Sequence, residues 1–149
     1  MFVNAVGVSA FGSGCKGKDG LAPVTGAAVS PAVGAGSFAI TVRNIPFLSA
    51  VVSVLGTSDQ SFNGIPLPFD LGAIGAPGCQ LRTNLVAMQV VVATTGAATP
   101  GGGTASAPWP IPNDPSLRSG TLYFTNLVLD AAANPGGLTA SAGLRVTIQ

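Results

Sequence analysis

The chain has 149 residues, a length typical of one domain with one core. Charged residues make up only 7% of it, the net charge is +1, and neither glutamate nor histidine occurs. Without a basic stripe we expect no binding of nucleic acid, and without histidine no Ser-His or Cys-His nucleophile can form. No uninterrupted apolar run approaches the roughly 18 residues that cross a membrane, so a membrane-spanning protein is not expected either.

The N-terminal stretch Phe2 to Phe11 is apolar on both faces and is tethered only at its far end. We expect it to form a strand that pairs within its own sheet. The alternative is that residues 2–11 are exchanged, so that a neighbouring copy receives the strand at an open sheet edge. In that case Phe2, Val3, Val6 and Val8 would be the residues of self-association.

The two cysteines lie in glycine-rich turns, Cys15 in Gly12-Ser-Gly-Cys-Lys-Gly and Cys79 in Gly75-Ala-Pro-Gly-Cys. Buried apolar thiols are not expected in such turns, so we predict a disulfide and an oxidising compartment. The chain-entropy model gives such a bond roughly 4 kcal/mol of stabilisation. Two unrelated free thiols are the alternative. A metal site is not expected, because no histidine or glutamate could complete the ligand set.

Short β-rich segments follow one another along the chain. Apolar and polar residues alternate over 37–43 and 144–148, which predicts strands with one buried face. Residues 48–55, 85–93 and 121–129 are apolar on both faces, as in central strands. Their outer faces would be covered by loops or by another subunit.

Turn signals separate these segments at Asn44-Ile-Pro, Asn63-Gly, Asn113-Asp-Pro and Asn134-Pro-Gly-Gly. The spacing predicts an all-β fold with eight or nine strands and no strand-helix-strand alternation. We expect one domain over 1–149, an antiparallel two-sheet β-sandwich of immunoglobulin-like or jelly-roll type.

The sequence offers little for catalysis. Its carboxylates are Asp19, Asp59, Asp70, Asp114 and Asp130, and none forms a recognisable catalytic pair. No run of closely spaced aspartates suggests calcium. We therefore expect no enzyme, no metal and no cofactor, and we expect Asp59 and Asp114 to accept hydrogen bonds in turns.

Trp109, in Ala107-Pro-Trp-Pro-Ile-Pro, is the one candidate ligand contact. Its proline neighbours favour an extended backbone that could present the indole as a stacking platform for sugar. In a small sandwich, however, a lone tryptophan more often fills the core or a corner.

The order of motifs resembles a β-sandwich domain of secreted surface proteins from planctomycetes, myxobacteria and similar bacteria. The resemblance covers nearly the whole chain and rests on Gly12-Ser-Gly-Cys-Lys-Gly, the strand pair over 37–45, Leu67-Pro-Phe-Asp-Leu, Gly75-Ala-Pro-Gly-Cys, Ile111-Pro-Asn-Asp-Pro and Leu122-Tyr-Phe. Lys16 stands where the pattern often has proline. The resemblance implies a secreted β-rich module, commonly attached to larger proteins, with its two cysteines paired. It implies no catalytic residues.

Low charge, strands apolar on both faces and the N-terminal segment together favour a structural role. We expect an extracellular or cell-surface subunit whose partners are copies of itself in a filament, fibre or surface layer. The alternative is a carbohydrate-binding or adhesive module that contacts surface glycans through Trp109.

Overall fold

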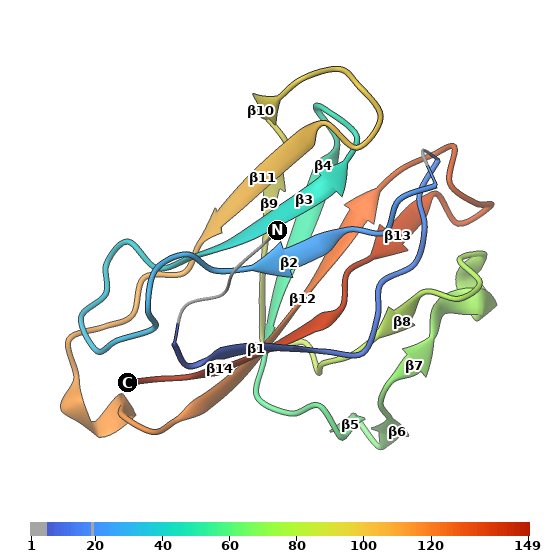
Figure 1. Cartoon of the computed structure of the whole chain (residues 1–149). Helices are drawn as coiled ribbons and strands as arrows, with labels where there is room; N and C mark the ends of the chain where they lie inside the picture. The colour runs from blue at the N-terminus through green and yellow to red at the C-terminus, as the bar shows by residue number, and fades with distance from the viewer. Residues whose placement is uncertain (1–5, 19) are drawn as a thin grey trace.

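The computed structural model describes residues 6–18 and 20–149. In these residues fourteen strands form antiparallel sheets, and the only helices are two 3-10 turns, η1 (Leu71–Ile74) and η2 (Pro115–Leu117) (Figure 1). The prediction of an all-β, antiparallel fold is confirmed. The predicted number of eight or nine strands is too low. Residues 57–83 contain four two-residue strands, which are too short to show a periodicity.

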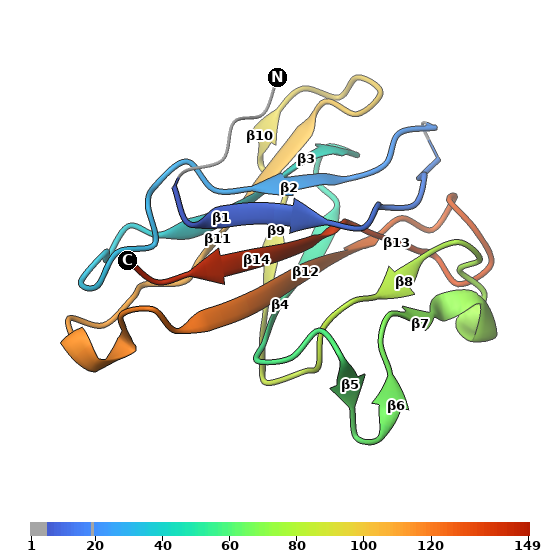
Figure 2. The same ribbon diagram turned by 60° about the horizontal axis from the view of Figure 1, so that its bottom comes forward.

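The largest sheet has six strands. Its order is β1 (Val8–Phe11), β14 (Gly143–Thr147), β12 (Thr121–Leu129), β4 (Ala50–Gly56) and β9 (Ala87–Val92), and β13 (Leu138–Ala140) also pairs with β12. Figure 2 shows β1, β14 and β12 side by side in this order. The second sheet has four strands in the order β10 (Thr95–Gly96), β11 (Gly103–Pro108), β3 (Ala39–Ile45) and β2 (Val24–Gly26).

Two small sheets lie between β4 and β9 in the chain. They pair β5 (Ser61–Phe62) with β6 (Ile65–Pro66), and β7 (Phe69–Asp70) with β8 (Gln80–Leu81). The Asn63-Gly turn signal falls between β5 and β6, and Asn63 there adopts a positive φ of 50°. Asparagine tolerates this backbone conformation better than most residues, so the turn forms where the sequence predicts it.

The two large sheets bury a common core. Phe38, next to β3, packs against Phe124 of β12 with ring centroids 6.4 Å apart. Ile40 and Val42 of β3 are also buried, each in a cluster with residues of the six-stranded sheet. The alternation over 37–43 therefore does bury one face of a strand, as predicted. Burial of these apolar side chains is the main force that holds the two sheets together.

Residues 57–83 cover part of the other face of the six-stranded sheet. Leu127 of β12 points away from Phe124, because successive side chains of a strand alternate between faces. There it packs against a second cluster, which the 57–83 segment supplies with Leu71, Ala76, Cys79 and Leu81. At Leu127 the expectation that a loop covers the outer face is thus confirmed, whereas Leu129 farther along the same face is 51% exposed.

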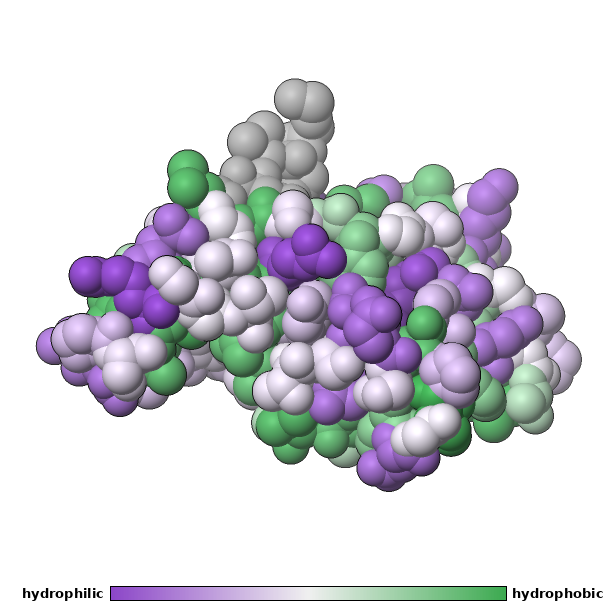
Figure 3. Space-filling view, turned by 90° about the horizontal axis from the view of Figure 1, so that it is seen from below, coloured by the Kyte–Doolittle hydropathy of each residue, from purple (hydrophilic) through white to green (hydrophobic). Residues whose placement is uncertain are grey.

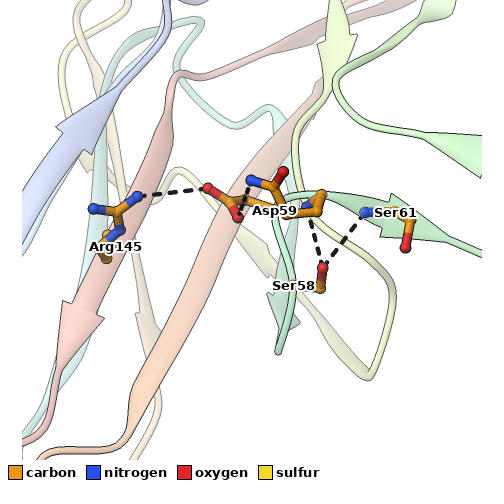
Figure 4. Close-up of polar contacts among 5 residues, drawn as sticks. Ser58, Asp59, Ser61 and Arg145 are labelled. Carbon is orange, nitrogen blue, oxygen red and sulfur yellow. Dashed lines mark hydrogen bonds and ion pairs between the residues drawn. The ribbon is translucent and has the colours of Figure 1, made fainter.

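Polar contacts also tie this segment to the sheet. Arg145 of β14 and Asp59 form an ion pair with 3.6 Å between Nη2 and Oδ2 (Figure 4). The hydroxyl of Ser58 accepts the main-chain N–H groups of Gln60 and Ser61. The side-chain oxygen of Asn84 accepts the main-chain N–H groups of Thr57 and Ser58, which lie at the start of the segment. Asp59 therefore anchors the segment by its charge, and its Oδ1 also accepts a hydrogen bond from the side-chain amide of Gln60 at 3.0 Å, where the sequence suggested a main-chain donor.

Candidate interaction sites

The two cysteines form the predicted disulfide. Cys15 and Cys79 are 64 residues apart in sequence, and their Cα atoms are 5.0 Å apart. Both lie buried in the cluster beneath the 57–83 segment. The bond ties the loop after β1 to this segment. A buried disulfide is consistent with folding in an oxidising compartment.

A buried arginine beside the disulfide was not anticipated from the sequence. Arg82 donates from Nη2 to the main-chain oxygen of Ser13, at 2.8 Å, and to the side-chain oxygen of Gln80, at 2.7 Å. Burial lowers the pKa of Arg82 from its usual value, yet an arginine remains charged at neutral pH. Gly12 has a positive φ of 69°, and a Cβ at this position would overlap the guanidinium. Arg82 thus explains why the motif around Cys15 begins with glycine.

The described part of the N-terminal segment pairs within its own chain. β1 runs antiparallel to β14, with Val8 opposite Val146, and Val8 packs against the main core cluster. Val6 precedes the strand and is 76% exposed. Phe2 and Val3 lie outside the described residues. Exchange of residues 2–11 between copies stays a prediction.

Trp109 packs into the fold. It follows β11, and its indole N–H donates to the hydroxyl of Ser53 on β4, at 3.1 Å. Its ring lies against Phe124, with centroids 5.6 Å apart. Together with Leu55 and Leu122 of the six-stranded sheet it lines an apolar cavity of about 290 Å³, which residues 110–112 and Leu117 also line. Because the N–H is already bonded inside the protein, it is not free to meet a sugar hydroxyl.

Asp114 acts as the turn residue that the sequence predicts. It caps η2, where its carboxylate accepts the main-chain N–H of Ser116 at 3.0 Å and the hydroxyl of the same residue at 2.8 Å. These hydrogen bonds hold the pKa of the Asp114 carboxyl below its usual value. Its role is local, within the loop before β12.

The most exposed apolar strand face lies on β9. Met88, Val90 and Val92 are 60%, 66% and 45% exposed. They stand opposite Val54, Val52 and Ala50 of β4 in that order. Val51 of β4 belongs to a core cluster. Its neighbours Ala50 and Val52 therefore point away from the core, and the three β9 residues opposite this face of β4 do the same.

β9 is also an edge strand of its sheet, because β4 is its one neighbour there. In an antiparallel pair, alternate residues turn their N–H and C=O groups toward the partner and the others turn them away. The N–H of Ala93 donates to the main-chain oxygen of Ser49, so Val91 and Gln89 bond to β4 by the same alternation. Met88, Val90 and Val92 therefore direct main-chain groups away from β4, and of these groups the carbonyl oxygen of Val92 already accepts the N–H of Thr94 at 2.8 Å.

This position corrects the prediction that residues 85–93 resemble a central strand and that a loop covers their outer face, while cover by another subunit stays a prediction. In the described residues β9 has a neighbour on one side only, and no loop covers the three apolar side chains. Figure 3 shows the molecule from below, where hydrophobic groups also reach the surface among polar ones.

The β9 edge carries no charge. From Thr83 to Asn113 the sequence has no lysine, arginine, aspartate or glutamate. The single polar side chain of β9 is Gln89, and it donates to the main-chain oxygen of Pro108 at 2.6 Å. Exposed edge strands usually carry charges, proline or a bulge that prevents pairing with another chain. β9 has neither a charged residue nor a proline.

Comparison of the chain with protein families, curated proteins and solved structures found no match. In the part of the chain that the structure describes, no helix is long and apolar enough to cross a membrane. The same residues contain no group of three or more histidine, cysteine or acidic side chains that could hold a metal ion.

Proposed function

We propose that this chain is an extracellular structural subunit that associates with copies of itself into a filament, fibre or surface layer. The observation that carries the proposal is the β9 edge, where the apolar side chains of Met88, Val90 and Val92 are exposed and the strand has no ladder partner on the side away from β4. Such an edge offers hydrogen bonds and apolar contact to a further strand.

The low charge of the chain supports the same proposal. A net charge of +1 and 7% charged residues leave little electrostatic repulsion between copies at neutral pH. The buried disulfide supports an extracellular setting, since such bonds persist mainly in oxidising compartments.

The proposed architecture is a β-sandwich. The four-stranded and six-stranded sheets share core clusters, which is the packing expected of two layers. In a sandwich the sheet edges remain open unless a loop or another chain covers them. This architecture would leave β9 accessible to a neighbouring copy.

Sedimentation velocity of the full oxidised chain over a wide range of concentration tests the proposal. We expect species heavier than the 14.6 kDa monomer, with a share that rises with concentration. Electron microscopy of native material would show whether they extend into filaments or layers. A particle that stays monomeric at every concentration and in native material would refute the proposed function.

A further inference from the structure

We infer that two copies pair their β9 strands antiparallel across a twofold axis at Val90, which joins their six-stranded sheets into one. This inference rests on the proposed self-association and specifies one of its contacts. An isologous contact of this kind closes into a dimer. A filament would need a second contact, for which the predicted exchange of residues 2–11 is a candidate.

Charge identifies a second copy as the occupant of the edge. In a twofold contact each surface meets itself, so any charge near the axis would face a like charge. β9, β10 and β11 all lie in the uncharged stretch from Thr83 to Asn113, so the edge meets its own copy without repulsion. An acidic or basic partner would find no opposite charge on these strands.

The alternation of main-chain groups determines the register. Two residues exchange a pair of hydrogen bonds in an antiparallel ladder only if both direct these groups toward each other. On β9 these residues are Met88, Val90 and Val92. Placing Val90 opposite Val90 lets these two residues exchange two main-chain hydrogen bonds and brings Met88 opposite Val92 of the other copy. Each of these outer pairs adds one bond, from the N–H of Val92 to the carbonyl of Met88, because the carbonyl of Val92 already accepts from Thr94. A shift by two residues would leave one of them without a partner.

The same register groups the exposed apolar side chains on one face. Met88 and Val90 would contact Val92 and Val90 of the other copy as cross-strand neighbours. A shift by one residue would instead place them opposite residues of the inner face, including Gln89. The register through Val90 therefore combines main-chain pairing with apolar contact.

The size of the contact indicates a reversible dimer. β9 has six residues, and a strand of that length spans about 20 Å. Pairing over this distance falls at the low end of the area found in stable interfaces. We therefore expect the dimer to dissociate on dilution, which allows its dissociation constant to be measured.

Introducing opposite charges at residue 90 tests the proposed twofold axis. In the proposed dimer, Val90→Lys places two lysines opposite each other, and Val90→Asp places two aspartates there. Each variant alone should dimerise at least about tenfold more weakly than the unchanged chain. An equimolar mixture should recover dimerisation, because lysine then faces aspartate. Sedimentation velocity measures the dissociation constants, and equal unfolding midpoints would show that this 66% exposed position tolerates both charges.

Two further pairs of variants complete the experiment. Ser106→Lys and Ser106→Asp change an exposed residue of β11 in the other sheet and should alter dimerisation neither alone nor mixed. Met88→Lys mixed with Val92→Asp should recover dimerisation as well, because this register places the two residues opposite each other.

The outcomes separate this inference from the proposed function. If the unchanged chain associates and both Val90 variants associate equally well, β9 is not the interface, while self-association through another contact stands. If the Val90 variants dissociate and their mixture does not recover, the twofold register is wrong. A chain that never associates refutes the proposed function and this inference together.

Discussion

Reduction of the bond between Cys15 and Cys79 should lower the free energy of unfolding by about 4 kcal/mol. This value follows from the entropy that the unfolded chain regains when a link across 64 residues is opened. This loss is a large share of the whole free energy of unfolding of a domain of this size, which is commonly about 5–15 kcal/mol. Urea unfolding of the oxidised and the reduced protein, monitored by the fluorescence of the single tryptophan, measures it.

The effect should begin in the segment that the bond holds. Without the disulfide, residues 57–83 keep the ion pair between Asp59 and Arg145. Because the Arg145 side chain is half exposed, this ion pair contributes about 1 kcal/mol or less. They also keep a main-chain hydrogen bond from Gly136 to Gly75 at 2.8 Å. We therefore expect amide hydrogen exchange in 57–83 to rise more than exchange in β4 and β12.

A double variant, Cys15→Ser with Cys79→Ser, serves as the control and should match the reduced protein to within the cost of two buried hydroxyls. A loss of stability below about 1 kcal/mol would contradict the entropic argument. Equal acceleration of exchange throughout the chain would show that the bond does not act mainly on the covering segment.

Three other changes probe single contacts. Trp109→Phe removes the hydrogen bond into β4 and enlarges the apolar cavity, so urea unfolding should show a loss of about 1–3 kcal/mol; no loss would mean that the indole does not support the core. The Asp114 carboxyl should titrate below its usual pKa by NMR, and Ser116→Ala should raise that pKa, because its hydroxyl bond is lost. Since the folded pKa is lowered, any stability from this group is present above the usual carboxyl pKa and disappears as pH falls through the folded pKa; an unchanged titration in the variant would contradict the assignment. Gly103→Ala puts a Cβ 2.7 Å from two main-chain oxygens and should destabilise the protein by about 1–3 kcal/mol, whereas Gly36→Ala, with open space around the new methyl group, should leave the unfolding midpoint nearly unchanged.

Local sequence patterns were sufficient for several features. The alternation around Ile40 and Val42 predicts a strand with one buried face, since the period of two belongs to the strand itself. The glycine-rich surroundings of Cys15 and Cys79 predicted a disulfide, and Asn63-Gly predicted a turn. Each of these signals lies within a few residues of the feature that it predicts.

Other features depend on contacts between distant segments. Leu127 is covered by the 57–83 segment, whose two-residue strands have no period, so the cover could not be inferred from local pattern. The burial of Arg82 could not be inferred from local pattern either, because it depends on hydrogen bonds to Ser13 and Gln80.

For β9 the sequence alone determined that a strand with two apolar faces and no charge would form. Whether such a strand is central or at an edge depends on how many neighbours it acquires, and periodicity does not record neighbours. The tertiary structure placed β4 on one side of β9 and, in the described residues, no hydrogen-bonded strand on the other. That arrangement leaves three apolar side chains of β9 exposed on a strand with one ladder partner.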